Sequence, residues 1–226
     1  YGLYLRKHKK DIERLKEGLR QYNVDVIYKK ANASSDQNRL DIINELKEMG
    51  DIQIKMFIHS IAFGTLKNMV NISGDSLNKK NIEMTLDTMC NNIIYWTQDL
   101  LQHQFLKEGS HILAMTSAGG RKNWPSYGAI SLAKAGIESV CRQLSLELAS
   151  HKISVNAIQA GVTETAALKK IPGHEKMIQD AVYNNPHNRL TTPEDIADFI
   201  EILLSYKSSW MTGNIIRVDG GEDITG

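Results

Sequence analysis

The feature that most constrains this chain is a regular alternation of short apolar strand patterns with longer helical patterns. Strand patterns rich in β-branched and aromatic residues occupy residues 1–5, 24–30, 52–63, 111–116, 153–158 and 213–218. Apolar residues spaced by three or four predict helices at residues 12–22, 36–49, 81–106 and 126–149. Thr192-Pro193-Glu194-Asp195 predicts the start of a further helix, with Thr192 as its N-cap. This alternation predicts a doubly wound α/β domain whose parallel sheet is covered on both faces.

The composition excludes several other classes of protein. Of the 226 residues, 42% are apolar and 23% are charged, which is typical of a globular domain. The 27 basic and 26 acidic residues leave a net charge of +1, so no global field attracts nucleic acid or an anionic membrane. Cys90 and Cys141 are too few for a disulfide framework and are typical of buried thiols.

The chain also lacks the sequence patterns of a membrane span, a signal peptide, a repeat or a linker. We therefore expect a single domain over residues 1–226, located in the cytoplasm. Neither a membrane nor a nucleic acid is expected as a partner, and no metal site is expected. Because a strand pattern starts at Tyr1, which is not an initiator methionine, we expect that the printed sequence begins inside a domain.

Ligands of doubly wound sheets bind beyond the carboxyl ends of the strands, so the residues that follow each strand are the first candidates. Arg6 and Lys7 follow the first strand, and positive charge there opposes the dipole of the next helix. We interpret them as ligands of a phosphate, rather than only as a solvated helix start. Asn32 and Ala33 follow the second strand and suit either contact with an adenine or a polar loop that caps the next helix.

Small residues follow the third and fifth strands. Ser60, Ile61 and Ala62 come after His59, which is interpreted as a buried core histidine rather than a catalytic group. After the fifth strand, Gly161 permits close approach of the backbone to a ligand and Thr165 supplies a hydroxyl. The stretch at residues 165–190 has breaks at Pro172-Gly173 and at Pro186, which suits a mobile lid over a substrate.

The fourth strand is followed by a helix that carries a tyrosine and a lysine. Tyr127 and Lys134 are seven positions apart, so that both side chains project from nearly the same helix face. A lysine ammonium near a tyrosine favours the phenolate and so increases the power of the phenol as a proton donor. By itself, the pair is better explained as one exposed lysine and one packed tyrosine on a helix.

Taken together, these pieces resemble the short-chain dehydrogenase/reductase family, and more narrowly its enoyl-acyl-carrier-protein reductase branch. The family's more common tyrosine, four positions before the lysine, is replaced by Ile130, whereas Tyr127 with its longer spacing to Lys134 is similar to the enoyl reductases. Three further segments are similar to motifs of the branch or of the family: His59-Ser60-Ile61-Ala62-Phe63-Gly64, Asn156-Ala157-Ile158-Gln159-Ala160-Gly161 and Val218-Asp219-Gly220-Gly221.

The chain departs from this family pattern in two places. It contains no Gly-x-x-x-Gly-x-Gly loop, so we expect the first strand and its glycine-rich loop to be missing from the printed sequence. Many enoyl reductases carry a second tyrosine ten positions before the active one. That position is Ser117 here, which matches the serine of the carbonyl-reducing relatives.

The resemblance implies a Rossmann-type dinucleotide-binding domain and an NADPH-dependent reductase, with NADH also possible. The expected substrate is a trans-2-enoyl thioester, on acyl carrier protein or coenzyme A, whose 2,3 double bond is reduced in fatty-acid-type metabolism. Tyr127, Lys134 and Ser117 are the implied catalytic residues. The expected cofactor contacts are Arg6, Lys7, Asn32, Ala33, Ser60, Ile61, Ala62, Thr116, Lys134, Gly161, Val162, Thr163 and Thr165.

Two alternatives stay open, and one further property is implied. Ser117 favours a carbonyl reductase of the 3-oxoacyl type. A cofactor-binding regulator without turnover is favoured only if the intact chain truly lacks the glycine-rich loop. Relatives of this family also imply a homo-oligomer, expected to be a tetramer, in which the helices at residues 81–106 and 126–149 pair across a two-fold axis.

Overall fold

The computed structural model describes residues 1–225. Its internal contacts divide the chain into two compact units, Tyr1–Asp51 and Ile52–Gly226. The single domain expected from the sequence therefore stays a prediction. No helix within residues 1–225 is both long enough and apolar enough to cross a membrane.

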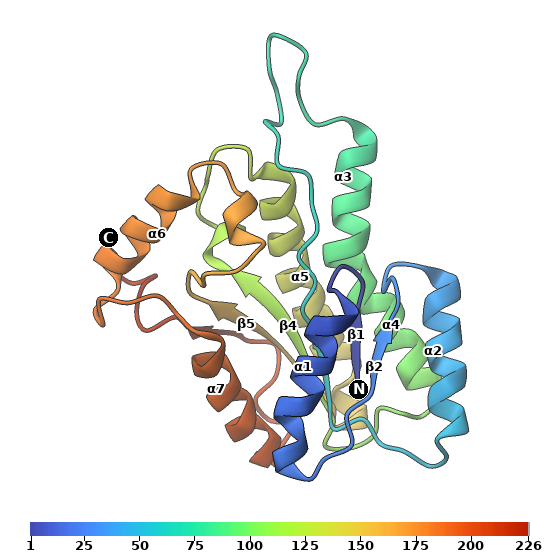
Figure 1. Cartoon of the computed structure of the whole chain (residues 1–226). Coiled ribbons are helices and arrows are strands. Elements are labelled where there is room, and N and C mark those ends of the chain that lie inside the picture. Colours follow the sequence, from blue (N-terminus) through green and yellow to red (C-terminus); the bar gives the residue numbers. More distant parts are fainter. Residues whose placement is uncertain (226) are drawn as a thin grey trace. The chain divides into compact units, whose positions relative to one another are not determined.

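The first unit is built from two parallel strands and two helices (Figure 1). Its elements are β1 (Gly2–Tyr4), α1 (Lys9–Leu19), a short 3-10 turn (Arg20–Tyr22), β2 (Tyr28–Lys30) and α2 (Asp36–Glu48). β1 pairs with β2 in register, with Tyr4 opposite Lys30. The Ser35 side chain accepts a hydrogen bond from the Asn38 amide and so caps α2, as the short polar loop before the helix requires.

The second unit contains a four-stranded parallel sheet in the order β3-β4-β5-β6. Its strands are β3 (Met56–His59), β4 (His111–Ser117), β5 (Ser154–Ala160) and β6 (Ile215–Val218). Its helices are α3 (Lys79–Leu86), α4 (Asn92–Gln102), α5 (Gly128–Glu147), α6 (His174–Asn184) and α7 (Pro193–Ser205). Parallel strands need crossover connections, and α5 and α7 provide the last two of them.

Helices cover both faces of this sheet, so the expected doubly wound α/β class is confirmed. On one face, Leu203 of α7 packs against Leu113 and Ile158 of the two central strands. On the other face, α5 lies against β4 and β5 and contacts α3 and the turn before α4. In β4 and β5 only the last residues and Met115 escape full burial, as expected for central strands of a parallel sheet.

The long helix expected at residues 81–106 is present in a different form. A π-helical turn, Asp87–Asn91, interrupts it between α3 and α4, and the helix ends at Gln102. Gln104 adopts a positive φ of 59°, and the amides of Phe105 and Leu106 fold back onto the Leu100 carbonyl. This backbone reversal ends the helix although the apolar pattern continues, because Phe105 and Leu106 are buried outside it.

The strands β2 and β3 fall furthest short of the lengths that their apolar patterns suggested. β2 forms only at Tyr28–Lys30, and β3 only at Met56–His59. β3 pairs with β4 from Met56 opposite His111 to His59 opposite Ala114, and the flanking apolar residues lie outside this ladder. The helix start at Thr192 is confirmed, because Thr192 and Asp195 form a reciprocal capping box.

Close packing between α5 and the π-helical turn makes Gly136 a test of this architecture. A Cβ on Gly136 would lie 2.7 Å from Cys90 Sγ. Overpacking of about 1–3 kcal/mol should outweigh the gain of about 1 kcal/mol from alanine in a helix. We therefore expect Gly136→Ala to lower the free energy of unfolding by about 1 kcal/mol in a denaturant titration.

Two controls accompany this prediction. Ser139→Ala, at an exposed position of the same helix, should change stability by no more than about 0.5 kcal/mol. Cys90→Ala introduced into the Gly136→Ala variant should restore part of the loss, because it removes the sulfur that the new methyl group meets. A Gly136→Ala variant more stable than the parent would contradict the packing.

Candidate active site

The end of β4 and the start of α5 bring Ser117 and Tyr127 together. Ser117 is the last residue of β4, and Tyr127 is the N-cap residue of α5. Between them, Gly119 lies against the tyrosine ring: a Cβ there would come within 2.6 Å of Tyr127 Cε1 and 3.2 Å of Ser117 Oγ. The glycine therefore leaves the space that the ring occupies.

Burial raises the pKa of the Tyr127 phenol, and the Ser117 hydroxyl opposes this shift. The contact does not meet the geometry of a formed hydrogen bond, so the buried Ser117 Oγ is left without a partner. The sequence suggested that a lysine would lower this pKa. In the structure, burial raises this pKa and the opposing influence comes from Ser117 rather than from a lysine. The net direction is upward, so the phenol is a protonated donor at neutral pH.

Lys134 is buried, with 8% of its surface exposed, and it lies two turns beyond Tyr127 on α5. Its Nζ donates a hydrogen bond to the Met115 carbonyl at 2.7 Å. Burial lowers the pKa of Lys134 to about 8, and the carboxylate of Glu138 acts in the opposite direction. An exposed lysine, which the sequence left open, is thereby excluded.

Two further polar residues lie under this pair. Thr116 Oγ1 donates to Glu138 Oε1 at 2.7 Å, and both side chains are buried. The sequence assigned Thr116 to the cofactor and overlooked Glu138. The signal for Glu138 was present, since it follows Lys134 by four positions and stands among apolar residues of the helix.

His59 is buried at the end of β3, as expected for a core histidine. Burial, and then the charge of Lys134, lower its pKa to about 4, whereas a hydrogen bond with Asn92 acts in the opposite direction. Its Nε2 atom has no hydrogen-bond partner. The imidazole is therefore neutral at physiological pH.

The residues after β3 follow the same edge of the sheet as Ser117, because β3 pairs with β4. Ser60 and Ala62 are exposed and Ile61 is half-buried. The sequence suggested these residues for the approach of a ligand, and this stays a prediction.

The segment after β5 is held mainly by its own chain. The Val162 amide donates to Glu222 Oε2 at 2.9 Å, and the Val162 carbonyl accepts from the Thr191 amide at 3.1 Å. Thr163 Oγ1 donates to the Gly161 carbonyl at 3.1 Å. Thr165 Oγ1 accepts from the Leu168 amide, also at 3.1 Å.

The structure shows why residue 161 must be a glycine, for a reason that the sequence did not reveal. A Cβ there would collide with Thr191 Oγ1 and would lie 2.9 Å from Glu222 Oε2. The protein's own side chains therefore take the space that was expected to admit a ligand. Of the neighbouring amides, that of Thr163 makes no hydrogen bond among residues 1–225.

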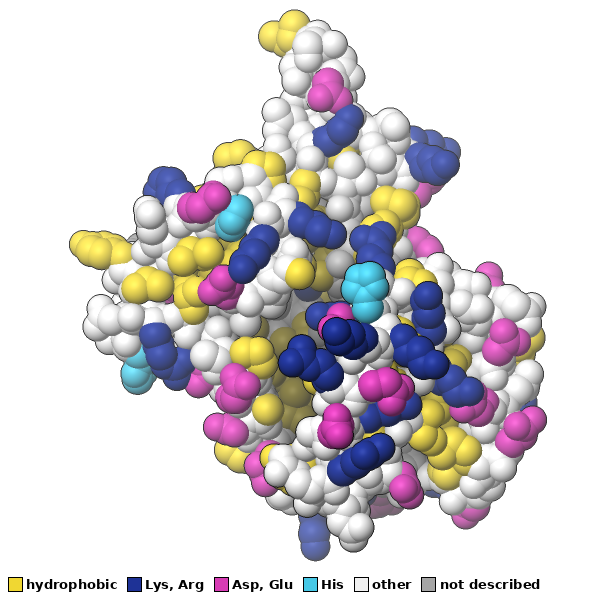
Figure 2. All heavy atoms as spheres, in the orientation of Figure 1, with side chains coloured by type: hydrophobic (Ala, Val, Ile, Leu, Met, Phe, Trp, Pro, Cys, Tyr) yellow, Lys and Arg dark blue, Asp and Glu magenta, His cyan; other side chains and the backbone are white. Residues whose placement is uncertain are grey.

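In the first unit, the segments after β1 and β2 lie at one edge of the small sheet, because the Ala31 amide donates to the Tyr4 carbonyl. Arg6, Lys7 and Asn32 are exposed there, and Ala33 is half-buried. Figure 2 shows Lys and Arg side chains gathered over α1 and the turn before it. Asn32 Oδ1 accepts from the Ser34 amide at 3.2 Å, so this carbonyl oxygen serves the local turn.

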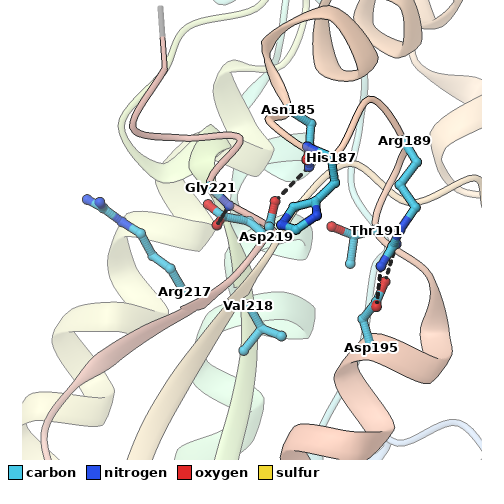
Figure 3. A pocket seen from close by; sticks show the side chains of 10 residues that line it. Asn185, His187, Arg189, Thr191, Asp195, Arg217, Val218, Asp219 and Gly221 are labelled. Carbon is cyan, nitrogen blue, oxygen red and sulfur yellow. Dashed lines mark hydrogen bonds and ion pairs between the residues drawn. The ribbon is translucent and has the colours of Figure 1, made fainter.

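A polar cleft of about 360 Å³ lies beside the end of β6 (Figure 3). Both arginines that line it are already paired: Arg189 forms a bidentate pair with Asp195, and Arg217 lies 3.3 Å from Asp223. A second cleft of about 290 Å³ is lined by Tyr127 together with Met69 and Trp124. We place the candidate site at the second cleft, because the Tyr127 phenol lies there with Ser117 and Lys134 nearby.

Within residues 1–225, no cluster of three metal-binding side chains is found.

The second unit combines a parallel doubly wound sheet with a serine at the end of β4 and a tyrosine and a lysine on the helix that follows, α5. This combination is typical of the class of short-chain dehydrogenases and reductases. Residues 3–222 match the family model described as enoyl-(acyl carrier protein) reductase, and the chain belongs to this family.

Individual relatives agree with this assignment. The chain is 33% identical over 172 residues to an enoyl-[acyl-carrier-protein] reductase [NADH] of Buchnera aphidicola, which covers 75% of this chain and 64% of that protein. It is 27% identical over 215 residues to the corresponding protein of Aquifex aeolicus, covering 95% and 78%. The chain thus spans less than two-thirds of the Buchnera protein.

The fold agrees equally well with a solved structure. The crystal structure of the Aquifex aeolicus enoyl-[acyl-carrier-protein] reductase (NADH) is similar with a TM-score of 0.83 at 25% identity. The match covers 99% of this chain and 85% of that one.

The neutral state of His59 gives a prediction for pH dependence. Its pKa is about 4 in the folded protein and about 6.5 when unfolded, so acid favours the unfolded chain, which binds the proton more readily. The stability associated with the neutral imidazole is present above pH 6.5 and is lost as the pH falls towards 4. We expect this loss to reach about 3 kcal/mol.

Denaturant titrations across this pH range measure the effect. His59→Gln should flatten the dependence between pH 6.5 and 4, whereas His151→Gln, at an exposed position, should leave it unchanged. Proton NMR should show that the His59 ring does not titrate between pH 5 and 8. A His59 ring that titrates near pH 6.5 would refute the assignment.

Proposed function

We propose that this chain carries the catalytic residues of a nicotinamide-dependent reductase that reduces the 2,3 double bond of a trans-2-enoyl thioester. The observation that carries the proposal is the grouping of Tyr127, Ser117 and the buried Lys134 at one edge of the sheet in a chain of this family. The proposed substrate is a thioester of acyl carrier protein or coenzyme A.

Each side chain has a role that its environment supports. Negative charge develops on the thioester oxygen when the double bond is reduced, and Tyr127 donates its phenolic proton to that oxygen. Burial keeps this proton on the phenol until the charge forms. Ser117 Oγ, which lacks a partner, supplies a second hydrogen bond. The bound nicotinamide supplies the hydride.

The residues present fit the nicotinamide half of a cofactor. Within residues 1–225, Lys134 donates one hydrogen bond, to the Met115 carbonyl, so two of its three N–H donors are available for ribose hydroxyls. The Thr163 amide is available for the carboxamide, whereas both polar backbone groups of Val162 are used within the chain. Val162 and Thr163 were both expected to contact the cofactor, and these hydrogen bonds favour the backbone of Thr163.

The identity of the cofactor is a finer proposal. The Buchnera and Aquifex relatives are named as NADH enzymes, which gives no support to NADPH as the preferred form. The exposed Arg6 and Lys7, at the edge shared with Asn32, are the features that support NADPH. We therefore propose a nicotinamide dinucleotide, with the choice between its two forms decided at Arg6 and Lys7.

Three expectations remain as proposals. Residues 165–190 would form a lid that includes α6 and the short turn Leu168–Lys170, with Leu168 and Ile171 already buried. The protein would be a homotetramer, and its location would be cytoplasmic.

A carbonyl reductase of the 3-oxoacyl type is the second candidate function, favoured by Ser117 at the position of a tyrosine in many enoyl reductases.

Tyr127→Phe tests the proposed function in the full-length protein. The change keeps the ring and removes only the hydroxyl, so kcat should fall by about 10²–10³-fold if that hydroxyl stabilises charge in the transition state. Cofactor affinity and fold should be nearly unchanged. Oxidation of the reduced cofactor is followed with crotonyl and acetoacetyl thioesters, which separate enoyl from carbonyl reduction.

The control is Tyr22→Phe, an exposed tyrosine that should behave like the parent. Ser117→Ala should cost less than Tyr127→Phe in an enoyl reductase and about as much in a carbonyl reductase. Full activity of Tyr127→Phe would refute the assignment of Tyr127 as the proton donor, since Ile130 offers no donor at the family's commoner position.

Charge reversal at Arg6 and Lys7 tests the cofactor proposal. If the two cations hold a 2′-phosphate, replacing both with Glu should weaken NADPH binding at least about tenfold more than NADH binding, because charged hydrogen bonds are lost only with NADPH. Dissociation constants are measured by fluorescence titration. The matched control reverses Lys9 and Lys10 at the start of α1, and equal losses for both cofactors would remove the phosphate assignment.

A further inference from the structure

Two side chains one turn apart on α5 hold the last residues of β4. Lys134 Nζ donates to the Met115 carbonyl and Glu138 Oε1 accepts from Thr116 Oγ1, each at 2.7 Å. Met115 and Thr116 directly precede Ser117. The strand end that carries Ser117 is therefore fixed at two consecutive residues by the helix that also carries Tyr127.

Both helix side chains are almost fully buried, at 8% exposure for Lys134 and 6% for Glu138. A buried charge is costly unless an opposite charge or several hydrogen bonds compensate it. The turn after β4 is shaped to admit the carboxylate: a Cβ on Gly120 would lie 3.1 Å from Glu138 Oε1 and 3.4 Å from the Ala135 amide. Gly120 thus lets Glu138 lie against this turn.

The other titratable groups around the pair do not supply a negative charge. His59, from β3, is neutral because its pKa is lowered to about 4. Burial raises the pKa of Cys141, on α5, to about 12 and also raises that of Cys90, in the π-helical turn, so both thiols stay protonated. Tyr127 is a neutral phenol. Among residues 1–225, Glu138 is the acidic group that acts on Lys134.

We propose that Glu138 is a positioning residue with two effects. Its carboxylate compensates the ammonium charge of Lys134, and its hydrogen bond with Thr116 fixes the strand end that carries Ser117. The meaning of these effects for catalysis rests on the proposed function. The electrostatic coupling between Glu138 and Lys134 does not, and it can be measured without turnover.

Two substitutions separate the charge from the hydrogen bond. Glu138→Gln removes the charge but keeps an oxygen that can accept from Thr116. Thr116→Val removes the hydroxyl but keeps the charge. Glu147→Gln is the control, because Glu147 is an exposed carboxylate on the same helix, and Glu138→Asp tests rescue by a shorter acid. Circular dichroism and thermal unfolding verify that each full-length variant is folded.

The first readout is the pKa of Lys134, followed by NMR of protein labelled with ¹³C-lysine and assigned with Lys134→Met. Glu138→Gln should lower this pKa by about 1 or more from its value near 8, because the opposite charge that raises it has been lost. Thr116→Val and Glu147→Gln should leave it within about 0.3 of the parent value, and Glu138→Asp should restore most of it. An unchanged pKa in folded Glu138→Gln overturns the proposal.

The second readout is the pH profile of enoyl thioester reduction. If protonated Lys134 is the active form, activity falls above its pKa, so Glu138→Gln should move this limb to lower pH and recover near pH 6. Thr116→Val should lower kcat at every pH without moving the limb. A uniform loss in Glu138→Gln, without a moved limb, also overturns the proposal. If the parent protein lacks activity, the proposed function fails while the NMR measurement still decides the coupling.

Discussion

The parallel pairing of β4 with β5 is the interaction on which the rest of the second unit depends. It is the longest ladder of the sheet, running from His111 opposite Ser154 to Ser117 opposite Ala160. Because a parallel pair cannot be closed by a tight turn, the chain must cross over through α5. The same pairing places Ser117 and the start of the segment after β5 at one edge of the sheet. The strand pairing that builds the core therefore also builds the candidate site.

At that edge, the interactions that stabilise the fold change from apolar packing to hydrogen bonds and charge pairing. The interior of the sheet is held by Leu113, Ile158 and Leu203, which need only burial. Beyond them, Lys134 and Glu138 are buried as charged groups and therefore need fixed partners. The helix that covers the core thus also carries Lys134, whose pKa burial lowers to about 8. Such a shift is typical of functional sites.

Near the candidate site, some polar groups form hydrogen bonds within the chain and others are left without hydrogen-bond partners. Val162 is tied to Glu222 and Thr191, and Gly161 is required by that packing. Ser117 Oγ and His59 Nε2, in contrast, are buried without partners. Buried polar atoms without partners are costly, so they mark the places where a ligand would contribute most.

The sequence by itself determined the α/β class, most elements, the start of α7 at Thr192 and the placement of Tyr127 and Lys134 along one helix. These features depend on local periodicity, capping and helix geometry, which a single segment encodes. Only the tertiary structure decided the π-helical turn, the burial of Lys134, the partnership of Thr116 with Glu138 and the reason for Gly161. Each of these joins segments that are distant in the chain or depends on burial, and pairing and desolvation are properties of the assembled fold.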